Sequence, residues 1–205
     1  MEIHLENLGR RFNREWIFKD INYQFVNNKA YAILGINGSG KSTLLQVISG
    51  ALTPSTGKLI YTQNLQAIDP EKYFKFISLA APYLELIEDF SLSEVLDFHF
   101  KFKSRLNSLD NTAIISLLGM QKNQHKLIKH FSSGMKQRVK LALAFCSDTP
   151  ILLLDEPTSN LDTQGTEWYL DMVKQFTTNR ITIIGSNQEN EYAFCDAHIN
   201  LEDYK

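Results

Sequence analysis

The stretch that decides the fold is Gly35-Ile36-Asn37-Gly38-Ser39-Gly40-Lys41-Ser42-Thr43. It follows a compact apolar run over Ala30 to Leu34 and precedes an apolar-periodic segment that stops at Gly50. A buried strand, a glycine-rich turn and a helix in this order bring backbone N–H groups together around an anion. The stretch therefore predicts a phosphate-binding loop at the start of a helix.

Each polar residue of this loop has a chemical reason to be there. Lys41 places a positive charge on the β- and γ-phosphates of a nucleotide, and the Ser42 hydroxyl is a ligand for Mg²⁺. Glycines leave room for the backbone to approach the phosphates. We therefore expect nucleotide contacts from the whole loop: Asn37, Gly38, Ser39, Gly40, Lys41, Ser42 and Thr43.

A second segment adds two carboxylates. Ile151-Leu152-Leu153-Leu154-Asp155-Glu156 is an apolar strand that ends in two acidic residues. Asp155 is suited to the Mg²⁺ shell, directly or through water. Glu156 can act as the general base that polarises an attacking water. An acidic strand end is a weak signal alone, but beside a phosphate loop it becomes a strong one.

The remaining pattern predicts the fold class. Further apolar runs at Phe76 to Leu79 and Ile181 to Ile184 resemble buried strands, and an alternating segment around Ile21 to Phe25 indicates a β part near the N-terminus. From Ser91 to about Gly119 the apolar spacing is helical. Continuous apolar strands separated by helices are typical of a parallel sheet covered on both faces. We expect an α/β P-loop NTPase core with an N-terminal antiparallel β part and an inserted helical block.

Composition limits the class of protein. A length of 205 residues suits one domain. The formal net charge of -2 does not indicate the basic surface that a nucleic-acid-binding protein usually has. The two cysteines, Cys146 and Cys195, show no metal-ligand or disulfide spacing, as expected in a reducing cytosol. No apolar run approaches the ~20 residues that span a bilayer, and the N-terminus does not resemble a signal peptide. We therefore expect any connection to a membrane to be made through another protein.

Two further motifs point to a family. Phe131-Ser132-Ser133-Gly134-Met135-Lys136-Gln137-Arg138 resembles the signature sequence LSGGQ and its basic continuation, and Pro157-Thr158-Ser159-Asn160-Leu161-Asp162 is similar to the D-loop. With the two nucleotide motifs, they make almost the whole chain resemble the ATP-binding subunit of ABC transporters. The resemblance implies ATP and Mg²⁺, bound between two cassettes arranged head to tail. Ser132 and Gly134 would then contact the ATP of the other cassette, and Asp162 would also belong to the ATP site.

The resemblance also implies an organisation and partners. It predicts one ABC ATPase domain over 1–205, with a RecA-like core at about 1–80 and 146–205 and a helical subdomain at about 81–145. It implies a separate transmembrane permease, a homodimer or a heterodimer with another cassette, and a place on the cytoplasmic face of the membrane. Phe12 takes the position of the aromatic that stacks on adenine, with Trp16 as a competitor.

The chain departs from the family at two positions. Residues 76 to 90 contain no glutamine, where the family usually has one that senses Mg²⁺. Asn187 takes the position of a histidine that contacts the γ-phosphate, and an amide cannot carry positive charge. We therefore expect a slow ATPase with Glu156, Lys41 and Asn187 in the catalytic roles. Ser186 or Gln188 could supply a substitute donor, and Glu85 or Glu88 could hold a water near Mg²⁺.

Three functions stay open at this point: a transport motor, an ATP-dependent dimerising clamp with little hydrolysis, and a soluble ABC ATPase of a non-transport assembly. The segment from Tyr83 to Phe102 is rich in large apolar residues. Most of them are expected in the core of the helical block. Phe98, Phe100 and Phe102 cannot all face one way on a helix, so some of them would be exposed in a groove for the permease.

Overall fold

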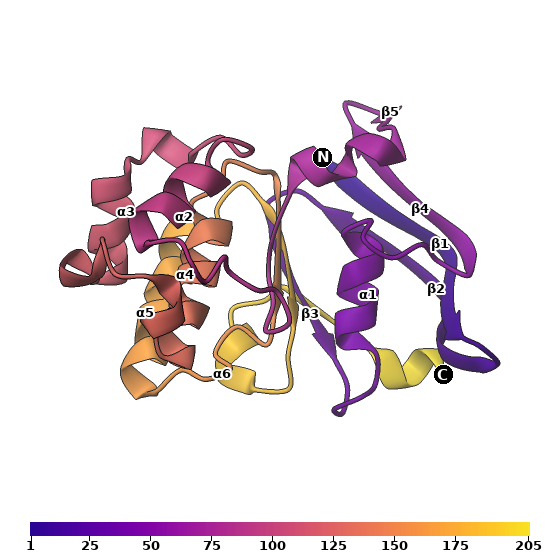
Figure 1. The fold of residues 1–205 in the computed structure, drawn as a ribbon. Coiled ribbons are helices and arrows are strands. Elements are labelled where there is room, and N and C mark those ends of the chain that lie inside the picture. The colour runs from indigo at the N-terminus through magenta and orange to yellow at the C-terminus, as the bar shows by residue number, and fades with distance from the viewer.

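A computed structural model describes residues 1–205, apart from the side chain of Ser108. Two sheets form its frame (Figure 1). The first is antiparallel, in the order β2-β1-β4-β5, and the second is parallel, in the order β6-β7-β8-β3-β9. The antiparallel strands are β1 (Glu2–Phe12), β2 (Glu15–Val26), β4 (Thr56–Gln63) and β5 (Gln66–Ala67). The parallel strands are β3 (Lys29–Leu34), β6 (Ile77–Ala80), β7 (Ile151–Asp155), β8 (Ile181–Gly185) and β9 (Ala197–Asn200).

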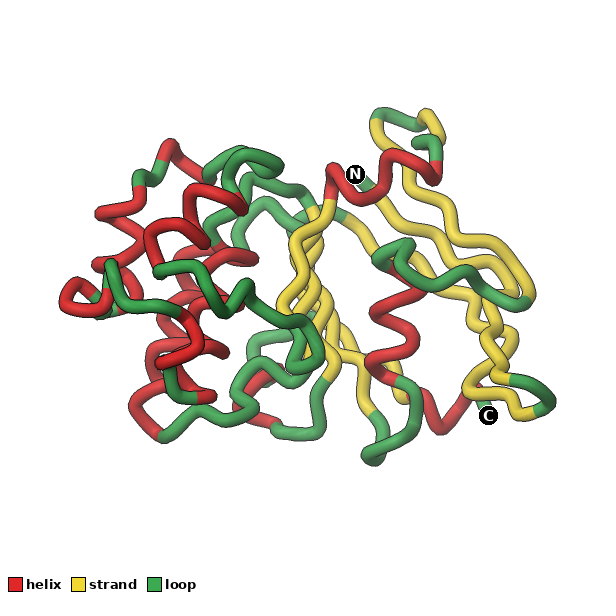
Figure 2. The backbone as a smooth tube through the Cα atoms, viewed as in Figure 1, coloured by secondary structure: helices red, strands yellow, loops and turns green.

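The helices divide between the two faces of the parallel sheet, as Figure 2 shows in red and yellow. Helix α1 (Lys41–Ile48) lies between the two sheets. On the other face lie α2 (Leu92–His99), α3 (Asn111–Leu118), α4 (Ser133–Phe145) and α5 (Thr163–Phe176), with the short α6 (Glu189–Tyr192) near the lower edge of the sheet in Figure 1. The 3₁₀ turns are Pro70–Phe76, Leu106–Ser108, Gln121–Asn123, Ile128–His130 and Leu201–Tyr204. The predicted α/β P-loop fold with an N-terminal antiparallel sheet is confirmed.

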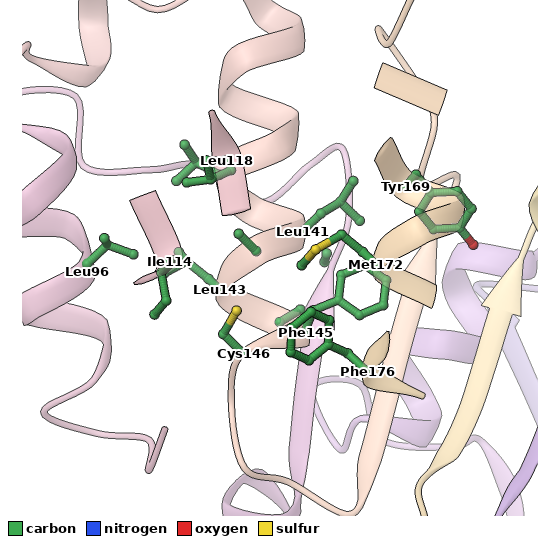
Figure 3. Close-up of a cluster of buried hydrophobic side chains, with 14 of the residues drawn as sticks. Leu96, Ile114, Leu118, Leu141, Leu143, Phe145, Cys146, Tyr169, Met172 and Phe176 are labelled. Carbon is green, nitrogen blue, oxygen red and sulfur yellow. The ribbon is translucent and has the colours of Figure 1, made fainter. Parts of the chain in front are cut away.

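The sheet separates two hydrophobic cores. One joins α1 to strands of both sheets and includes Leu44, Leu45 and Phe25. The other packs α2 to α5 against the opposite face of the parallel sheet, and Figure 3 shows its centre at Phe145 and Met172. Strands β7 and β8 are buried along their whole length, because each contributes alternate side chains to both cores.

The predicted helical pattern from Ser91 to Gly119 is wrong in its middle. Helix α2 ends at His99, and α3 begins only at Asn111. Between them Arg105 forms an isolated antiparallel bridge with Ser147, and the Leu106 N–H donates to the Cys146 carbonyl. These pairings with the end of α4 draw the chain out of the helix, so tertiary contacts override the helical periodicity.

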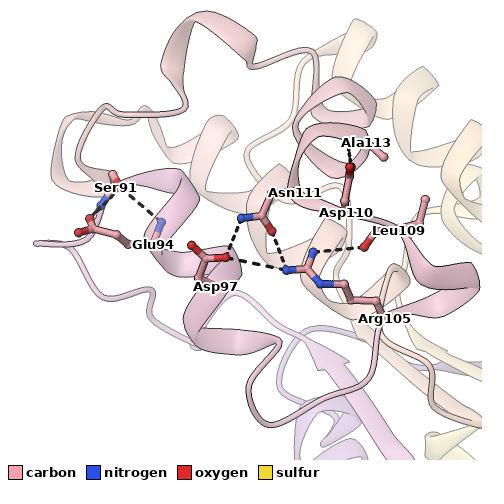
Figure 4. Close-up of polar contacts among 8 residues, drawn as sticks. All are labelled: Ser91, Glu94, Asp97, Arg105, Leu109, Asp110, Asn111 and Ala113. Carbon is pink, nitrogen blue, oxygen red and sulfur yellow. Dashed lines mark hydrogen bonds and ion pairs between the residues drawn. The ribbon is translucent and has the colours of Figure 1, made fainter.

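Polar side chains fix the ends of α2 and α3 (Figure 4). Ser91 and Glu94 form a capping box at the start of α2, in which Ser91 N donates to Glu94 at 2.7 Å. Asn111 joins the two helices, since it donates to Asp97 at 2.8 Å and accepts from Arg105 at 2.7 Å. The two helices are therefore held in one orientation by side chains as well as by apolar packing.

His99, the last residue of α2, makes the stability of the protein depend on pH. Burial lowers the pKa of His99 from 6.5 to about 4, and its Nε2 contacts Ser147 Oγ at 2.9 Å. Since the folded pKa lies below the unfolded one, this stability is present above pH 6.5 and is lost as the pH falls toward 4. We expect the free energy of unfolding to be roughly 1–2 kcal/mol lower at pH 5 than at pH 7. Urea titrations at both pH values check this, and in His99→Gln most of the difference should disappear.

Candidate functional site

The phosphate loop lies at the carboxyl end of β3, where the chain turns into α1. Gly40 has a φ of 107°, and a Cβ at this position would lie 2.3 Å from Ile17 Cγ2, so only glycine fits. Lys41 is 4% exposed, and its Nζ donates to the carbonyls of Gly35 at 2.9 Å and Ile36 at 3.3 Å. No carboxylate in the described part of the chain forms an ion pair with it. A buried cation held only by carbonyls is ready to attract an anion.

The acidic end of β7 lies at the same edge of the sheet. Strands β7, β8 and β3 are neighbours, with Asp155 opposite Gly185 and Gly185 opposite Ile33. Ligands of such parallel sheets bind outside the carboxyl ends of the strands. Asp155, Glu156 and the phosphate loop therefore lie together at the carboxyl edge of the sheet, and we call these residues the strand-end site.

Asp155 is the buried carboxylate of the strand-end site and is 1% exposed. Burial raises the pKa of its carboxyl from 3.8 to about 6, while the Ser42 hydroxyl and Lys41 act in the opposite direction. Its Oδ1 has no hydrogen-bond partner in the described part of the chain. Mg²⁺ binds few protein oxygens and keeps several waters, so an unpaired carboxylate oxygen close to a serine hydroxyl fits it.

Glu156 has a strained backbone. Its φ is 42°, and its N–H donates to the Gly185 carbonyl at 2.9 Å. A left-handed conformation costs a residue with a side chain about 1–3 kcal/mol, and such residues concentrate at functional sites. This backbone conformation fixes the direction in which the Glu156 side chain projects from the end of β7.

Asn187 faces the phosphate loop. It follows β8, and its Nδ2 donates to Oδ1 of Asn37 in the loop at 2.7 Å. This hydrogen bond links the segment after β8 to the phosphate loop. The role of Asn187 at the γ-phosphate, which the family resemblance implies, stays a prediction.

Ser132, Gly134 and Asp162 belong to a different surface. Together with Asn160 they line a hollow of about 270 Å³ that contains no residue of the phosphate loop. A Cβ at Gly134 would lie 2.8 Å from the Asn160 carbonyl oxygen, so glycine lets the two segments touch. Ser132 caps α4 by accepting from Met135 N, and Asp162 caps α5 by accepting from Gly165 N at 2.7 Å. Within one chain these three residues do not meet the loop.

The two aromatic candidates lie on the hairpin of β1 and β2. Phe12 and Trp16 are both exposed, with the Arg10 guanidinium 4.6 Å from the Phe12 ring and Arg11 5.5 Å from the Trp16 ring. Neither contact selects one ring as a platform for adenine. The assignment of Phe12 stays a prediction.

Some residues that neighbour the strand-end site have partners that the sequence does not predict. Glu88 pairs with Lys136 at 2.5 Å, so its carboxylate is directed to α4. Tyr83 lies beside Gln46 of α1, and burial and the nearby Asp155 raise its pKa. Ser186 donates to Glu191, a buried residue that no sequence motif singles out. The only signal for Glu191 in the sequence is its place four residues after Asn187.

Comparisons with known proteins agree on one family. The family model for ABC transporters matches residues 18–159. An uncharacterised ABC transporter ATP-binding protein of Bacillus subtilis, YybJ, is 29% identical over 97% of this chain and 92% of its own length. The lantibiotic transport ATP-binding protein SrtF of Streptococcus pyogenes is 26% identical over 90% of this chain and 79% of its own.

Solved structures share the fold. A putative ABC transporter ATP-binding protein from Pyrococcus furiosus superposes with a TM-score of 0.83 over 100% of both chains, at 22% identity. The ATP-binding cassette MJ0796, a dimer bound to ADP and phosphate, gives a TM-score of 0.82 over 97% of this chain and 93% of its own, at 21% identity. At this level of identity, the likeness shows the fold alone.

Proposed function

The chain belongs to the ABC transporter family as an ATP-binding protein, and from this we propose that it is the ATP-hydrolysing motor of a transporter whose permease is a separate polypeptide. The observation that carries the proposal is the strand-end site at the carboxyl ends of β3 and β7. There, buried Lys41, Ser42, Asp155 and Glu156 lie at one edge of the sheet. This is the set of groups that phosphoryl transfer to water needs.

Each group has one task in this proposal. When ATP binds, Lys41 donates to phosphate oxygens in place of the two loop carbonyls that accept from it here. Ser42 and Asp155 would hold Mg²⁺, which would supply positive charge to neutralise the phosphates. Glu156 accepts a proton from the attacking water. Asn187 releases Asn37 and donates its amide N–H to the γ-phosphate.

A second cassette completes the site. The hollow lined by Ser132, Gly134 and Asp162 shares no residue with the phosphate loop, yet it opens at the start of α4, where exposed N–H groups favour an anion. In a head-to-tail pair, each copy places this hollow over the nucleotide of the other. The partner is either a second copy of this chain or a different cassette.

The permease would dock on the helical part, at about residues 81–145. No helix in the described part of the chain is long and apolar enough to cross a membrane. An apolar groove of about 250 Å³ lies beside α2. Phe98 and Phe102, on its wall, are 42% and 72% exposed. Such an apolar patch suits a short helix of the permease, and in this proposal the motor lies on the cytoplasmic face of the membrane.

Charge in this groove should break docking. We expect Phe98→Asp to lower co-purification with the permease by at least about 10-fold, because a carboxylate would be buried against apolar atoms. Phe74→Asp is the matched control, since Phe74 is exposed but does not line the groove. Pull-down of the tagged permease measures the effect. A folded Phe98→Asp protein that co-purifies as well as the control would remove the groove from the proposal.

Phosphate release from the purified chain with Mg-ATP tests hydrolysis, with Glu156→Gln as the blank. Turnover above the blank supports the motor. ATP binding without turnover, in the isolated chain and again with its permease, would contradict it. That result would favour a second function, an ATP-dependent clamp that dimerises and hardly hydrolyses. The observation in favour of the clamp is the neutral amide of Asn187 beside the phosphate loop.

Asn187→His should increase turnover about 10-fold or more, because a protonated imidazole stabilises developing phosphate charge better than an amide does. Single-turnover hydrolysis with saturating ATP measures this without a contribution from binding. Asn190→His, on an exposed position of α6, controls for a histidine nearby. An Asn187→His protein with unchanged or lower turnover would show that this position does not limit the rate.

A further inference from the structure

Glu191 is a carboxylate buried where its charge has no cation. It lies on α6 and is 1% exposed. No lysine, arginine or histidine in the described part of the chain forms an ion pair with it. Burying an unpaired charge is costly unless hydrogen bonds compensate for lost water. A residue of this kind needs a reason to be in this place.

Three donors compensate the Glu191 carboxylate. Oε1 accepts from the backbone N–H of Thr158 at 2.7 Å and also from the Thr158 hydroxyl. Oε2 accepts from the Ser186 hydroxyl. The Tyr169 hydroxyl on α5 donates to the backbone carbonyl of Glu191 at 2.9 Å, which holds α6 in place. Both carboxylate oxygens are thus used, one on each side.

The two oxygens contact two different segments, one that follows Glu156 and one that precedes Asn187. Thr158 comes two residues after Glu156 and opens the segment that runs to Asp162 at the hollow. Ser186 directly precedes Asn187, and its Oγ also accepts from Gln188 N at 2.9 Å. One carboxylate therefore links Thr158, two residues after the expected general base, to the hydroxyl of Ser186, the residue before the expected γ-phosphate contact. The negative charge of Glu191 also acts on Asp155, since Glu191 is among the groups that raise the pKa of Asp155.

We propose that Glu191 is a positioning residue for hydrolysis, which holds Glu156 and Asn187 in register through Thr158 and Ser186. The proposal rests on the proposed ATPase function. Glu191 does not touch the nucleotide, so its loss should change the rate and leave ATP affinity nearly unchanged. A displacement of about 1 Å between reacting groups can cost roughly 100-fold in rate.

Glu191→Gln is the informative variant, because glutamine has the same shape but offers one acceptor oxygen in place of two. When its oxygen accepts from Thr158 N–H, its NH₂ group faces Ser186. That group is a donor and cannot accept the hydrogen bond that the Ser186 hydroxyl donates to Glu191. We expect turnover to fall about 10–100-fold, with the Kd for Mg-ATP changed by less than about 3-fold. Glu189→Gln on the exposed face of the same helix should behave like the wild type.

Hydrogen exchange gives a readout that does not depend on turnover. In Glu191→Gln the peptides covering 157–162 and 186–190 should exchange faster, while those of β3 and α1 keep their protection. Equal loss of turnover and ATP affinity would overturn the proposal, because it would indicate general destabilisation. Unchanged exchange in both segments would overturn it as well. A wild-type chain without turnover would count against the proposed function, and the exchange data would then decide the role of Glu191 by themselves.

Discussion

Glu156→Gln is expected to lower phosphate release from Mg-ATP by at least about 100-fold, since general-base catalysis contributes 10²–10⁴. ATP binding should stay within a few-fold of the wild type, because Lys41, Ser42 and Asp155 remain. The glutamine keeps the size of the side chain and cannot accept a proton at neutral pH. In the proposed mechanism the ATP-bound dimer then persists, so light scattering should show a higher mass with ATP than without it.

The exposed carboxylate of Glu71 provides the control, since it lies in the turn before β6, at the amino ends of the parallel strands rather than at their carboxyl ends. Glu71→Gln should leave both turnover and mass unchanged. Hydrolysis by Glu156→Gln at more than about a tenth of the wild-type rate would exclude Glu156 as the base. Asp155 or a water held by other residues would then have to be considered.

Arg180→Met is expected to be strongly destabilising although it lies outside the site, lowering the free energy of unfolding by about 3 kcal/mol. Arg180 is 4% exposed, and its guanidinium donates to three backbone carbonyls: Thr149 at 2.8 Å, Phe145 at 2.9 Å and Phe176 at 3.2 Å. Phe145 and Phe176 are the last residues of α4 and α5, so one cation satisfies carbonyls at two helix ends. Methionine fills the space and leaves these acceptors buried without donors.

Thermal unfolding measures this effect. For a chain of this size, a loss of 3 kcal/mol lowers Tm by roughly 6–12 °C. Arg14→Met is the control, because Arg14 is exposed on the hairpin of β1 and β2. Burial lowers the pKa of Arg180 to about 10, so the side chain is still charged at neutral pH. An Arg180→Met protein that melts with the wild type would show that the carbonyls find other partners.

The parts of this protein that a sequence predicts are those whose chemistry is local. The strand, the glycine turn and the helix from Ala30 to Ile48 follow one another along the chain, so their pattern reveals the phosphate loop. The acidic end of β7 is equally local. Asn187 could be connected to the loop only through the family resemblance, and its hydrogen bond to Asn37 joins residues 150 positions apart.

The parts that the sequence did not predict depend on contacts between distant segments. Glu191 looks like an ordinary acidic residue of a short helix until Thr158 and Ser186 fold around it. The helix expected through 100–110 is interrupted because that segment pairs with the end of α4. Neither the boundary nor the buried carboxylate has a periodicity or motif that marks it, since each depends on a partner far along the chain.

The parallel sheet also separates the packing that supports the phosphate loop from the packing that supports the groove beside α2. Apolar side chains under α1 belong to one core, and those under the groove beside α2 belong to the other. If the proposed function holds, a substitution that reshapes the groove for a new membrane partner must be accommodated in the second core, while the packing beneath the phosphate loop stays as it was. The ATP site could then be kept unchanged while the docking surface evolves to fit different partners.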